Sequence, residues 1–406
     1  MKKINLEIKA LSPLAIGKQK PGGNISEVEQ YIPGSVIRGA VASQILKQAN
    51  TSISEGDDFH ELFLGDNPAI FQNAYPANHK IKSEVKVIPA TALSSKGKSG
   101  FKSKKNHGVF DTLIDRFCAE SYGYIYDPNC PVDGGRVDTF TGFYSQKDGK
   151  YYQNSADNRL LTRVGINRRR ATSEERVLYS IAVLNESQEK KKQPQPVIYA
   201  GRVIVNDNLA SLLQQFLDNH QDDLRLGGAG SRGLGKVKIT AKVPTEIKTN
   251  VINQIDKFNQ QLHQRWNQWG DIFGSPLEGF SDKRTYFTID LQSDAILTEN
   301  WQRTTVISPE ILQQYTGFTD LSLQIHAAYS SYDYRSGWNS AWGLMKDVEL
   351  VTNKGSVYLF STEKKDLWLQ AWEDLEVYGI GARTSEGFGQ VQICNEFHCI
   401  FRENAK

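Results

Sequence analysis

A glycine-rich stretch that occurs twice decides how this chain folds. Residues 227–239 read GGAGSRGLGKVKI, and residues 379–393 read GIGARTSEGFGQVQI. Both end in Gly-(Leu/Phe)-Gly-(Lys/Gln)-Val-(Lys/Gln)-Ile, and the numbers of Gly235 and Gly389 differ by 389 − 235 = 154. Each copy follows an apolar, helix-like stretch and runs into an alternating strand pattern. A duplicated unit of helix, glycine loop and strand predicts two related domains in one chain.

The composition of these loops indicates nucleic-acid binding. Glycine leaves the backbone bare, so that its N–H groups can approach a phosphodiester chain closely. Arg232, Lys236 and Arg383 add positive charge at the two loops. A phosphate loop of the nucleotide-hydrolase type is disfavoured, because Lys236 is followed by Val237 and not by Ser or Thr. The alternative is a pair of structural turns that join a helix to an edge strand.

Length and charge set the broad class of protein. The chain has 406 residues, of which 39% are hydrophobic, and this predicts a folded protein of two domains. The formal net charge is only +2, but residues 96–105 hold five lysines and residues 159–170 hold five arginines, with no acid in either stretch. Such local patches can hold a phosphate backbone although the total charge is near zero. A solvated loop is the simpler interpretation of the lysine run.

Four cysteines, Cys118, Cys130, Cys394 and Cys399, are too few for a disulfide framework in a chain of this length. They are typical of reduced thiols in the cytoplasm, and Cys394 and Cys399 are predicted to pack within the last strand. The first residues alternate apolar and polar side chains, which is a strand pattern and not a signal peptide. No apolar stretch is long enough to span a membrane. We therefore expect a cytoplasmic protein without a membrane partner.

The order of predicted elements gives an α+β fold of two ferredoxin-like (RRM-like) modules with long insertions. The predicted domains are residues 1–243, with an irregular insertion at about 94–195, a linker helix within 244–283, and residues 284–406. Ser35 is a plausible N-cap for the first helix. The predicted strands are residues 3–11, 85–93, 197–205, 236–243, 285–297, 323–329, 348–361 and 390–400, with a hairpin at 142–152. The predicted helices are residues 35–48, 209–217, 247–269, 309–314 and 367–378.

Several motifs together resemble a known superfamily. The sequence Ile32-Pro33-Gly34-Ser35 opens a helix, and glycine loops precede the last strand of each module. This combination resembles the repeat-associated mysterious protein (RAMP) superfamily of CRISPR systems. Residues 162–172 (TRVGINRRRAT) resemble the central arginine motif of large type III RAMP subunits, and residues 336–339 (SGWN) with 355–358 (GSVY) resemble their second domain. Residues 91–96 (TALSSK) and 107–113 (HGVFDTL) are similar to the Csx-ten family of type III-D complexes.

The resemblance implies a non-catalytic subunit of an antiviral ribonucleoprotein complex. Such subunits hold the 5′ handle of the crRNA, contact the large signalling subunit and the backbone RAMP subunits, and meet target RNA only indirectly. The expected RNA-binding residues are Lys18, Gly34, Ser35, Arg38, Arg163, Arg168, Arg169, Arg170, Gly228, Gly230, Ser231, Arg232, Gly233, Lys236, Gly381, Arg383 and Ser385. Arginine can fork onto phosphates and stack on bases, and Tyr144, Tyr151 and Tyr152 are candidate stacking rings or ordinary hairpin packing.

The alternative function is a metal-independent RAMP ribonuclease that processes precursor crRNA. It would need a histidine within hydrogen-bond reach of the attacking 2′-hydroxyl. The first histidine in the chain is His60, and His60, His79 and His107 all fall in insertions, away from the first strand and helix. Asp133 and Asp138 are weaker candidates for a loop aspartate like that of the backbone subunits.

A metal site is expected to be absent, as is any other cofactor. Relatives carry cysteines that, with the histidine of the HisGly motif, would form a tetrahedral zinc site. Here Ser95 stands at one of those positions, which leaves only His107, Cys118 and Cys130 as candidates. Three ligands do not complete a closed structural site.

Overall fold

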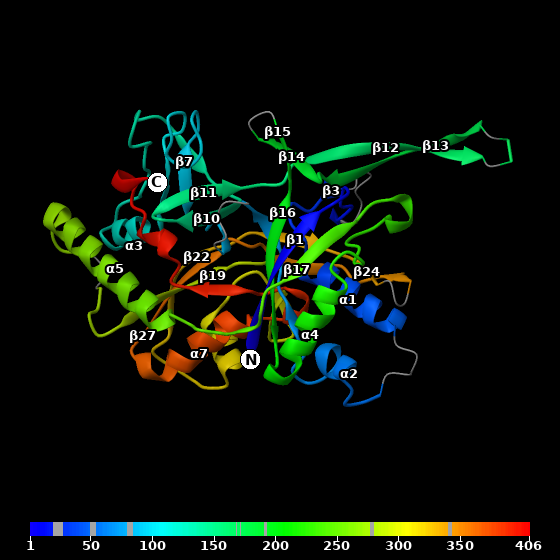
Figure 1. The fold of residues 1–406 in the computed structure, drawn as a ribbon. Coiled ribbons are helices and arrows are strands. Elements are labelled where there is room, and N and C mark those ends of the chain that lie inside the picture. The colour runs from blue at the N-terminus through cyan, green and yellow to red at the C-terminus, as the bar shows by residue number, and fades with distance from the viewer. Residues whose placement is uncertain are drawn as a thin grey trace.

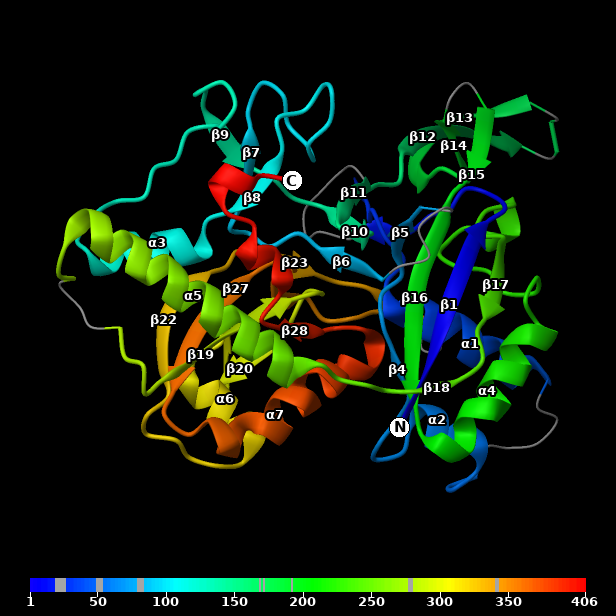
Figure 2. The same ribbon diagram turned by 60° about the vertical axis from the view of Figure 1, so that its left-hand side comes forward.

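The structure is a computed structural model that describes residues 1–18, 27–48, 54–78, 84–167, 169–170, 172–190, 193–276, 280–339 and 343–406. Two antiparallel sheets lie next to each other, one in each half of the chain (Figures 1 and 2). A long ribbon of two strands extends from the first half away from the body of the molecule (Figure 1).

The first sheet is a ferredoxin-like module. Its elements are β1 (Lys2–Ala10), α1 (Gly34–Gln48), β4 (Ile70–Phe71), β5 (Tyr75–Ala77), β16 (Ile198–Val205), α4 (Asp207–Asn219) and β17 (Val237–Ala241). The order across the sheet is β17-β1-β16-β4, and β5 also pairs with β16. When β4 and β5 are taken together as the second strand, the elements follow the predicted β-α-β-β-α-β order.

The second sheet has the same plan. Its elements are β19 (Thr285–Leu291), α6 (Pro309–Thr316), β22 (Gln324–Tyr329), β27 (Val357–Thr362), α7 (Lys365–Tyr378) and β28 (Val391–Ile393). The order across the sheet is β22-β27-β19-β28. In both sheets the first strand lies between the third and the fourth, so the predicted fold class is confirmed.

Alternation along the strands decides which faces are buried. In β1, Ile4, Leu6 and Ile8 are buried in a core that includes Val41 of α1 and Leu213 of α4. The intervening residues of β1 point to the other face of the sheet, because successive side chains of a strand point to opposite sides. The helices therefore cover one face of the first sheet and leave the other face polar.

The second sheet is covered on both faces. On one face, Phe287 of β19 contacts Trp368 and Trp372 of α7. On the other face, Asn259 of the long helix α5 (Val251–Phe273) bonds both the N–H and the carbonyl oxygen of Tyr286. The helix expected at residues 247–269 thus packs against the second sheet.

The insertion in the first half is regular, whereas the sequence predicted an irregular segment. Its elements are β6 (Val85–Val87), β7 (Ala92–Ser95), β8 (Val109–Asp111), α3 (Leu113–Ser121), β9 (Val137–Thr139), β10 (Phe143–Lys147), β11 (Lys150–Asn154), β12 (Asn158–Asn167), β13 (Thr172–Leu184), β14 (Ser187–Lys190) and β15 (Gln193–Pro196). Helix α3 packs on α5 in the core of the second module. The part of the insertion around α3 therefore rests on the second module, whereas β12–β15 lie beside the first module (Figure 2).

The remaining elements are short. They are β2 (Gly17–Lys18), β3 (Glu27–Val28), α2 (Asp58–Phe63), β18 (Thr245–Glu246), β20 (Leu297–Glu299), β21 (Gln302–Thr304), β23 (Tyr332–Arg335), β24 (Trp338–Asn339), β25 (Leu344–Met345), β26 (Glu349–Thr352) and the 3₁₀ turns η1 (Gly230–Arg232), η2 (Thr384–Glu386), η3 (Glu396–Cys399) and η4 (Arg402–Asn404).

Several predicted boundaries are wrong. Helix α1 begins at Gly34, so Ser35 lies inside its first turn and is not the N-cap. The strand expected at 85–93 is split into β6 and β7, and those expected at 285–297 and 348–361 are also interrupted. The last strand ends at Ile393, because Cys394 has a φ of 46°. Cys399 lies in η3, although Cys394 is buried in the core as expected.

A buried histidine fastens the insertion to the second module. His398 of η3 has its Nδ1 3.2 Å from Asp111 Oδ1 of β8 and its Nε2 2.6 Å from Asp290 Oδ1 of β19. Burial alone would lower the pKa of His398, but the two carboxylates outweigh it and raise the pKa to about 10. A charged imidazolium therefore joins three segments in the interior.

Within the described part of the chain, none of the helices combines the length and apolar character needed to cross a bilayer.

Candidate nucleic-acid interface

The two glycine loops have matching backbone conformations at equivalent positions. Equivalent positions are those whose numbers differ by 154. Their φ angles are 88° and 88° for Gly227 and Gly381, 57° and 58° for Ala229 and Arg383, 83° and 94° for Gly233 and Gly387, and 82° and 65° for Gly235 and Gly389. A 3₁₀ turn, η1 or η2, occupies the middle of each loop. The repeat seen in the sequence is therefore a repeat of backbone structure.

Equivalent backbone bonds fix each loop to the segment that follows the first strand of its own module. The Gly228 N–H donates to the carbonyl oxygen of Ala15 at 2.8 Å, and the Ala382 N–H donates to that of Ile296 at 2.9 Å. A Cβ on Gly227 would lie 2.5 Å from Ala15 O, and a Cβ on Gly381 would overlap the equivalent Ile296 oxygen. These close approaches explain why the sequence has glycine there.

The second loop is covered by the first module. A Cβ on Gly387 would lie 2.8 Å from both the carbonyl oxygen of Phe71 and the Oδ1 of Asn73, and 3.2 Å from the Cα of Gly34. The Gly34 N–H donates to the same Asn73 Oδ1 at 2.8 Å. Gly34 is buried by this contact, so its role in the structure is to let α1 and the second loop approach each other.

Charge also differs between the loops. Position 386, equivalent to Arg232 because 386 − 154 = 232, is a glutamate. Its Oε2 lies 2.6 Å from Nη2 of Arg383 and 3.0 Å from Nζ of Lys346. Burial alone would raise the pKa of Glu386, but the hydrogen bonds and charges of Arg383 and Lys346 outweigh it and lower the pKa to about 2. The Arg383 cation is thus neutralised inside the loop.

The first loop is open. Gly228, Ser231, Arg232 and Gly233 are exposed, and a Cβ on Gly233 would meet no described atom within 4 Å. Nη1 of Arg232 donates to the hydroxyl of Tyr179 at 2.9 Å, and the guanidinium lies 5.4 Å from the centre of that ring. An exposed bare backbone beside a cation and an aromatic ring can bind a phosphodiester chain and a base.

The two-stranded ribbon of β12 and β13 extends this basic surface. Arg163 of β12 pairs in register with Tyr179 of β13, so both side chains lie on the face that meets Arg232. Arg169 and Arg170 are exposed at the turn of the ribbon, and Arg168 lies outside the described residues. We define the ribbon face as Arg163, Tyr179, Arg232 and the exposed backbone of residues 227–233.

Other expected binding residues have protein partners. Lys18 Nζ lies 2.6 Å from Asp333 Oδ2. Nη2 of Arg38 donates to the carbonyl oxygen of Phe63 at 2.6 Å, and burial lowers the pKa of Arg38. Ser35 and Ser385 are half-buried near the contact between α1 and the second loop. In the first loop, Gly230 is half-buried and Lys236 is exposed.

Two of the three candidate stacking rings pack against other rings of the protein, and the third, Tyr152, is half-buried. Tyr144 is fully buried, and Tyr151 stacks on it and on Phe101. Sequence reasoning missed the exposed aromatic residues, of which Trp301 is fully exposed at a hairpin turn with a φ of 65°. Hairpin turns with positive φ usually contain Gly, Asn or Asp, so the sequence has no signal for a tryptophan there.

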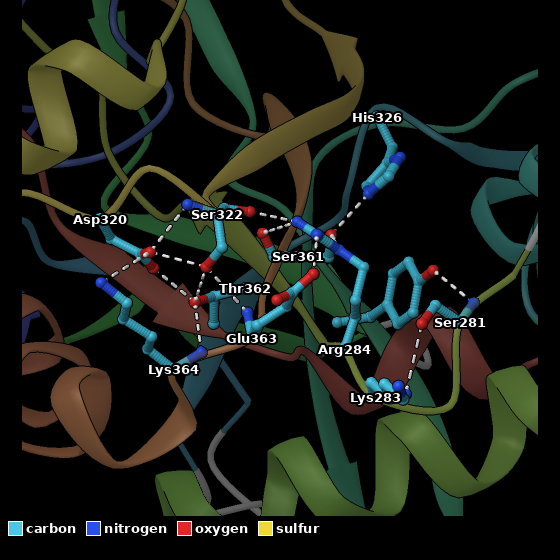
Figure 3. Close-up of polar contacts among 11 residues, drawn as sticks. Ser281, Lys283, Arg284, Asp320, Ser322, His326, Ser361, Thr362, Glu363 and Lys364 are labelled. Atoms are coloured by element: carbon cyan, nitrogen blue, oxygen red, sulfur yellow. Dashed lines mark hydrogen bonds and ion pairs between the residues drawn. The ribbon is translucent and has the colours of Figure 1, made fainter.

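The polar network of the second module includes a serine and a histidine in contact, which is relevant to the ribonuclease alternative (Figure 3). His326 Nε2 lies 2.7 Å from Ser361 Oγ, which also accepts a hydrogen bond from Nε of Arg284. Burial, and then the charge of Arg284, lower the pKa of His326 to about 4. Ser361 is fully buried, so its hydroxyl is held in place by His326 and Arg284.

A polar cleft of about 700 Å³ separates the open face of the first sheet from the second module. Arg202 of β16 lies in this cleft and forms an ion pair with Glu84. Side-chain amides line much of the rest, from Asn5, Gln72, Gln254, Gln292, Gln390 and Gln392. These residues are far apart in the sequence, so no local motif could have predicted the cleft.

The candidate metal ligands separate into two places. Cys118 lies in the core between α3 and α5, and burial raises the pKa of its thiol to about 12. His107 and Cys130 lie together instead, and Asp133 is the third member of their cluster. The set His107, Cys118 and Cys130 is therefore wrong in one member.

Comparisons with known proteins identify related sequences and folds. The sequence profile of the RAMP superfamily matches residues 7–238, which is more than half of the chain. No curated protein sequence matches the chain. One solved structure with a similar chain is a Type III-B Cmr-beta complex bound to cognate target RNA and AMPPnP, with a TM-score of 0.42 and 11% identity over 90% of this chain and 88% of that one. Another is oligomeric Cmr4 from Pyrococcus furiosus, with a TM-score of 0.25 and 13% identity over 60% of this chain and 98% of that one.

Proposed function

The chain belongs to the RAMP superfamily, and from this premise we propose that it is a non-catalytic RNA-binding subunit of a type III CRISPR effector complex. In this proposal it holds the 5′ handle of the crRNA and joins the large signalling subunit to the backbone subunits. The motifs at residues 91–96 and 107–113 favour a type III-D complex of the Csx-ten kind.

The observation that supports this proposal most strongly is the ribbon face. An extended single strand of RNA is held by cations, backbone amides and aromatic rings. Arg232 and Tyr179 are in contact, Arg163 pairs with Tyr179 across the ribbon, and the glycine backbone beside them is exposed. The equivalent surface of the second loop is covered by α1, so the proposal assigns RNA to the first loop alone.

A substitution at Gly230 tests RNA binding. A Cβ at Gly230 would approach only Arg225 Cδ, at 3.6 Å, which is ordinary contact, so Gly230→Asp is compatible with the fold. The new carboxylate would face phosphate, and like charges repel. We expect affinity for single-stranded repeat RNA, measured by fluorescence anisotropy, to fall about ten-fold or more. Gly39→Asp is the control, because a Cβ at Gly39 meets no described atom within 4 Å and the residue is exposed on α1.

The tip of the ribbon, which lies on the same two strands beyond the ribbon face, tests the electrostatic part of RNA binding. Each phosphate contact with single-stranded nucleic acid contributes about 0.7 to the slope of log affinity against log salt. Replacing Arg169 and Arg170 with alanine is expected to reduce both the affinity and this slope. An unchanged affinity and slope in both the tip variant and Gly230→Asp, with the folds intact by circular dichroism, would contradict RNA binding at the ribbon face.

The absence of catalysis is tested on the same RNA. End-labelled repeat RNA is expected to remain at full length after incubation with the purified chain. Cleavage at a defined position that is lost in a histidine variant, while binding persists, would favour the ribonuclease alternative. Co-purification of the wild-type chain, but not Gly230→Asp, with the other subunits and crRNA would support a role in assembly.

A further inference from the structure

Three side chains of the insertion converge on one point. His107 precedes β8, whereas Cys130 and Asp133 lie in the loop between α3 and β9. Cys130 Sγ lies 3.6 Å from His107 Nδ1, and Asp133 Oδ2 lies 3.1 Å from the same nitrogen. Their ligand atoms all lie within 4.8 Å of one another.

These separations match the edges of a tetrahedral zinc site. Bonds of about 2.3 Å from zinc to sulfur and about 2.0–2.1 Å from zinc to nitrogen or oxygen, at tetrahedral angles, put sulfur and nitrogen about 3.5 Å apart and nitrogen and oxygen about 3.4 Å apart. The observed distances of 3.6 Å and 3.1 Å are close to these values. A small adjustment of the exposed Asp133 side chain would lengthen the 3.1 Å separation between its Oδ2 and His107 Nδ1.

The donor types select the metal. A thiolate and an imidazole are ligands for zinc, whereas calcium and magnesium prefer sites made of oxygen atoms. Cys130 is 1% exposed and the His107 side chain 12% exposed, while the Asp133 side chain is 43% exposed. The sulfur and nitrogen atoms of the cluster are thus shielded from solvent, whereas the carboxylate is in contact with it. A water molecule on the carboxylate side can therefore be the fourth ligand of the ion.

Residues 130–135 have little apolar packing of their own, whereas Tyr124 and Tyr126, earlier in the same loop, lie against Phe273 and Trp269. Val132 is 58% exposed. Short backbone bonds shape residues 130–135: the Gly134 N–H donates to the Cys130 carbonyl oxygen, and the Gly135 N–H donates to Asp133 Oδ1. This turn brings Asp133 back beside Cys130, but its own apolar side chains give it little anchorage.

The histidine, in contrast, comes from a fixed segment. Its neighbour Gly108 packs against Ala405, where an added Cβ would lie 3.1 Å from the alanine Cβ. Val109 and Lys406 exchange two backbone hydrogen bonds, of 2.8 Å and 2.9 Å. An ion bound at this point would therefore join residues 130–135, which have little packing, to the well-packed segment that contains His107.

We propose that the chain binds one zinc ion through His107 Nδ1, Cys130 Sγ and Asp133 Oδ2, with water as the fourth ligand. The ion fastens residues 130–135 to the turn that precedes β8. In this role the ion holds a loop in place and is separate from RNA binding, because none of the three residues belongs to the ribbon face.

The test measures metal in the full chain. Wild-type protein, purified without chelator, is expected to hold about one zinc per chain by plasma mass spectrometry. Cys130→Ser is expected to lose the zinc, and Asp133→Asn to bind it more weakly in a competition with a chromophoric chelator. The matched controls are Cys399→Ser, a half-buried thiol of η3, and Asp138→Asn, an exposed acid nearby; both are expected to retain zinc.

Cobalt gives a second readout, which reports directly on whether the thiolate is a ligand. The Co²⁺-loaded wild type and Asp133→Asn are expected to show thiolate-to-cobalt absorption, and Cys130→Ser is expected to lack it. If Cys130→Ser fails to fold, Asp133→Asn decides, because its side chain is partly exposed. Wild-type protein without stoichiometric zinc, or variants of Cys130 and Asp133 that bind zinc as tightly as the controls do, would overturn the proposal.

Discussion

In the first glycine loop Arg232 is exposed beside Tyr179, whereas in the second loop Glu386, at the equivalent position, is held by Arg383 and Lys346. The two backbones nevertheless have matching φ angles at the equivalent positions between Gly227 and Gly235 in one loop and Gly381 and Gly389 in the other. The difference lies in what covers them: the start of α1 rests on Gly387, and among the described residues no equivalent element rests on Gly233. A duplicated backbone can thus be left open in one copy and form an internal contact in the other.

The largest expected effect breaks the contact at the second loop. A Cβ on Gly34 would overlap the carbonyl oxygen of Phe71 and lie 2.9 Å from that of Glu386. Gly34→Ala is therefore expected to destabilise the protein by about 3 kcal/mol or more, since backbone atoms must move. Gly39→Ala, in the same helix and with no described neighbour within 4 Å, is expected to stabilise it by about 0.5–1 kcal/mol. Urea unfolding of both variants measures the difference, and equal stabilities would mean that Gly34 does not pack closely against Phe71 and the second loop.

A matched pair of glycines sharpens the comparison between the loops. Gly387 and Gly233 are equivalent and both have positive φ, so an alanine costs about 1–2 kcal/mol at either position. Gly387→Ala would in addition press on Phe71 and Asn73, which adds about 1–3 kcal/mol, whereas Gly233→Ala has open space around it. Chemical denaturation is expected to rank Gly387→Ala as the less stable variant. The reverse ranking would place the covered surface on the first loop.

The smallest expected effect concerns charge and pH. The pKa of Glu386 is lowered to about 2 from an ordinary value of 4.5, so its contribution to stability is present above about pH 4.5 and is lost as the pH falls toward 2. Glu386→Gln is expected to cost about 1–2 kcal/mol at pH 7, after allowance for solvent screening, and progressively less below pH 4.5. Thermal unfolding across this range checks the prediction, with the exposed Glu246→Gln as control. A cost that does not depend on pH would show that the carboxylate charge is not responsible.

The sequence predicted the plan of both modules because that plan rests on local patterns. Alternation in β1 and the repeated glycine loop are visible in the chain itself, and both reappear in the sheets and in the φ angles. Interruptions within strands were missed where a single residue, such as Cys394 with its positive φ, ends the pairing. Periodicity does not indicate where such a residue turns the chain.

The surroundings of the loops could not be predicted, because they depend on segments distant in the sequence. Gly34 and Gly387 lie near opposite ends of the chain, and only the packed structure brings them into contact. The cluster of His107 and Cys130 was partly foreseen, but Asp133 enters it through a tight turn that has no sequence signature. Cys118 was wrongly predicted as a candidate metal ligand, because its position on α3 turns the thiol toward α5.

The position of α3 has a consequence for how the protein is made. Helix α3 begins at Leu113, and its packing partner α5 begins only at Val251, after the whole remainder of the insertion and the end of the first module. At roughly 5–20 residues per second, a ribosome needs on the order of ten seconds to synthesise that interval. During this time the first module can pair its strands, but Leu113, Ile114 and Tyr122 remain without their final neighbours. The nascent chain therefore exposes these apolar side chains until the second half emerges, and the two halves of this protein complete their folding together.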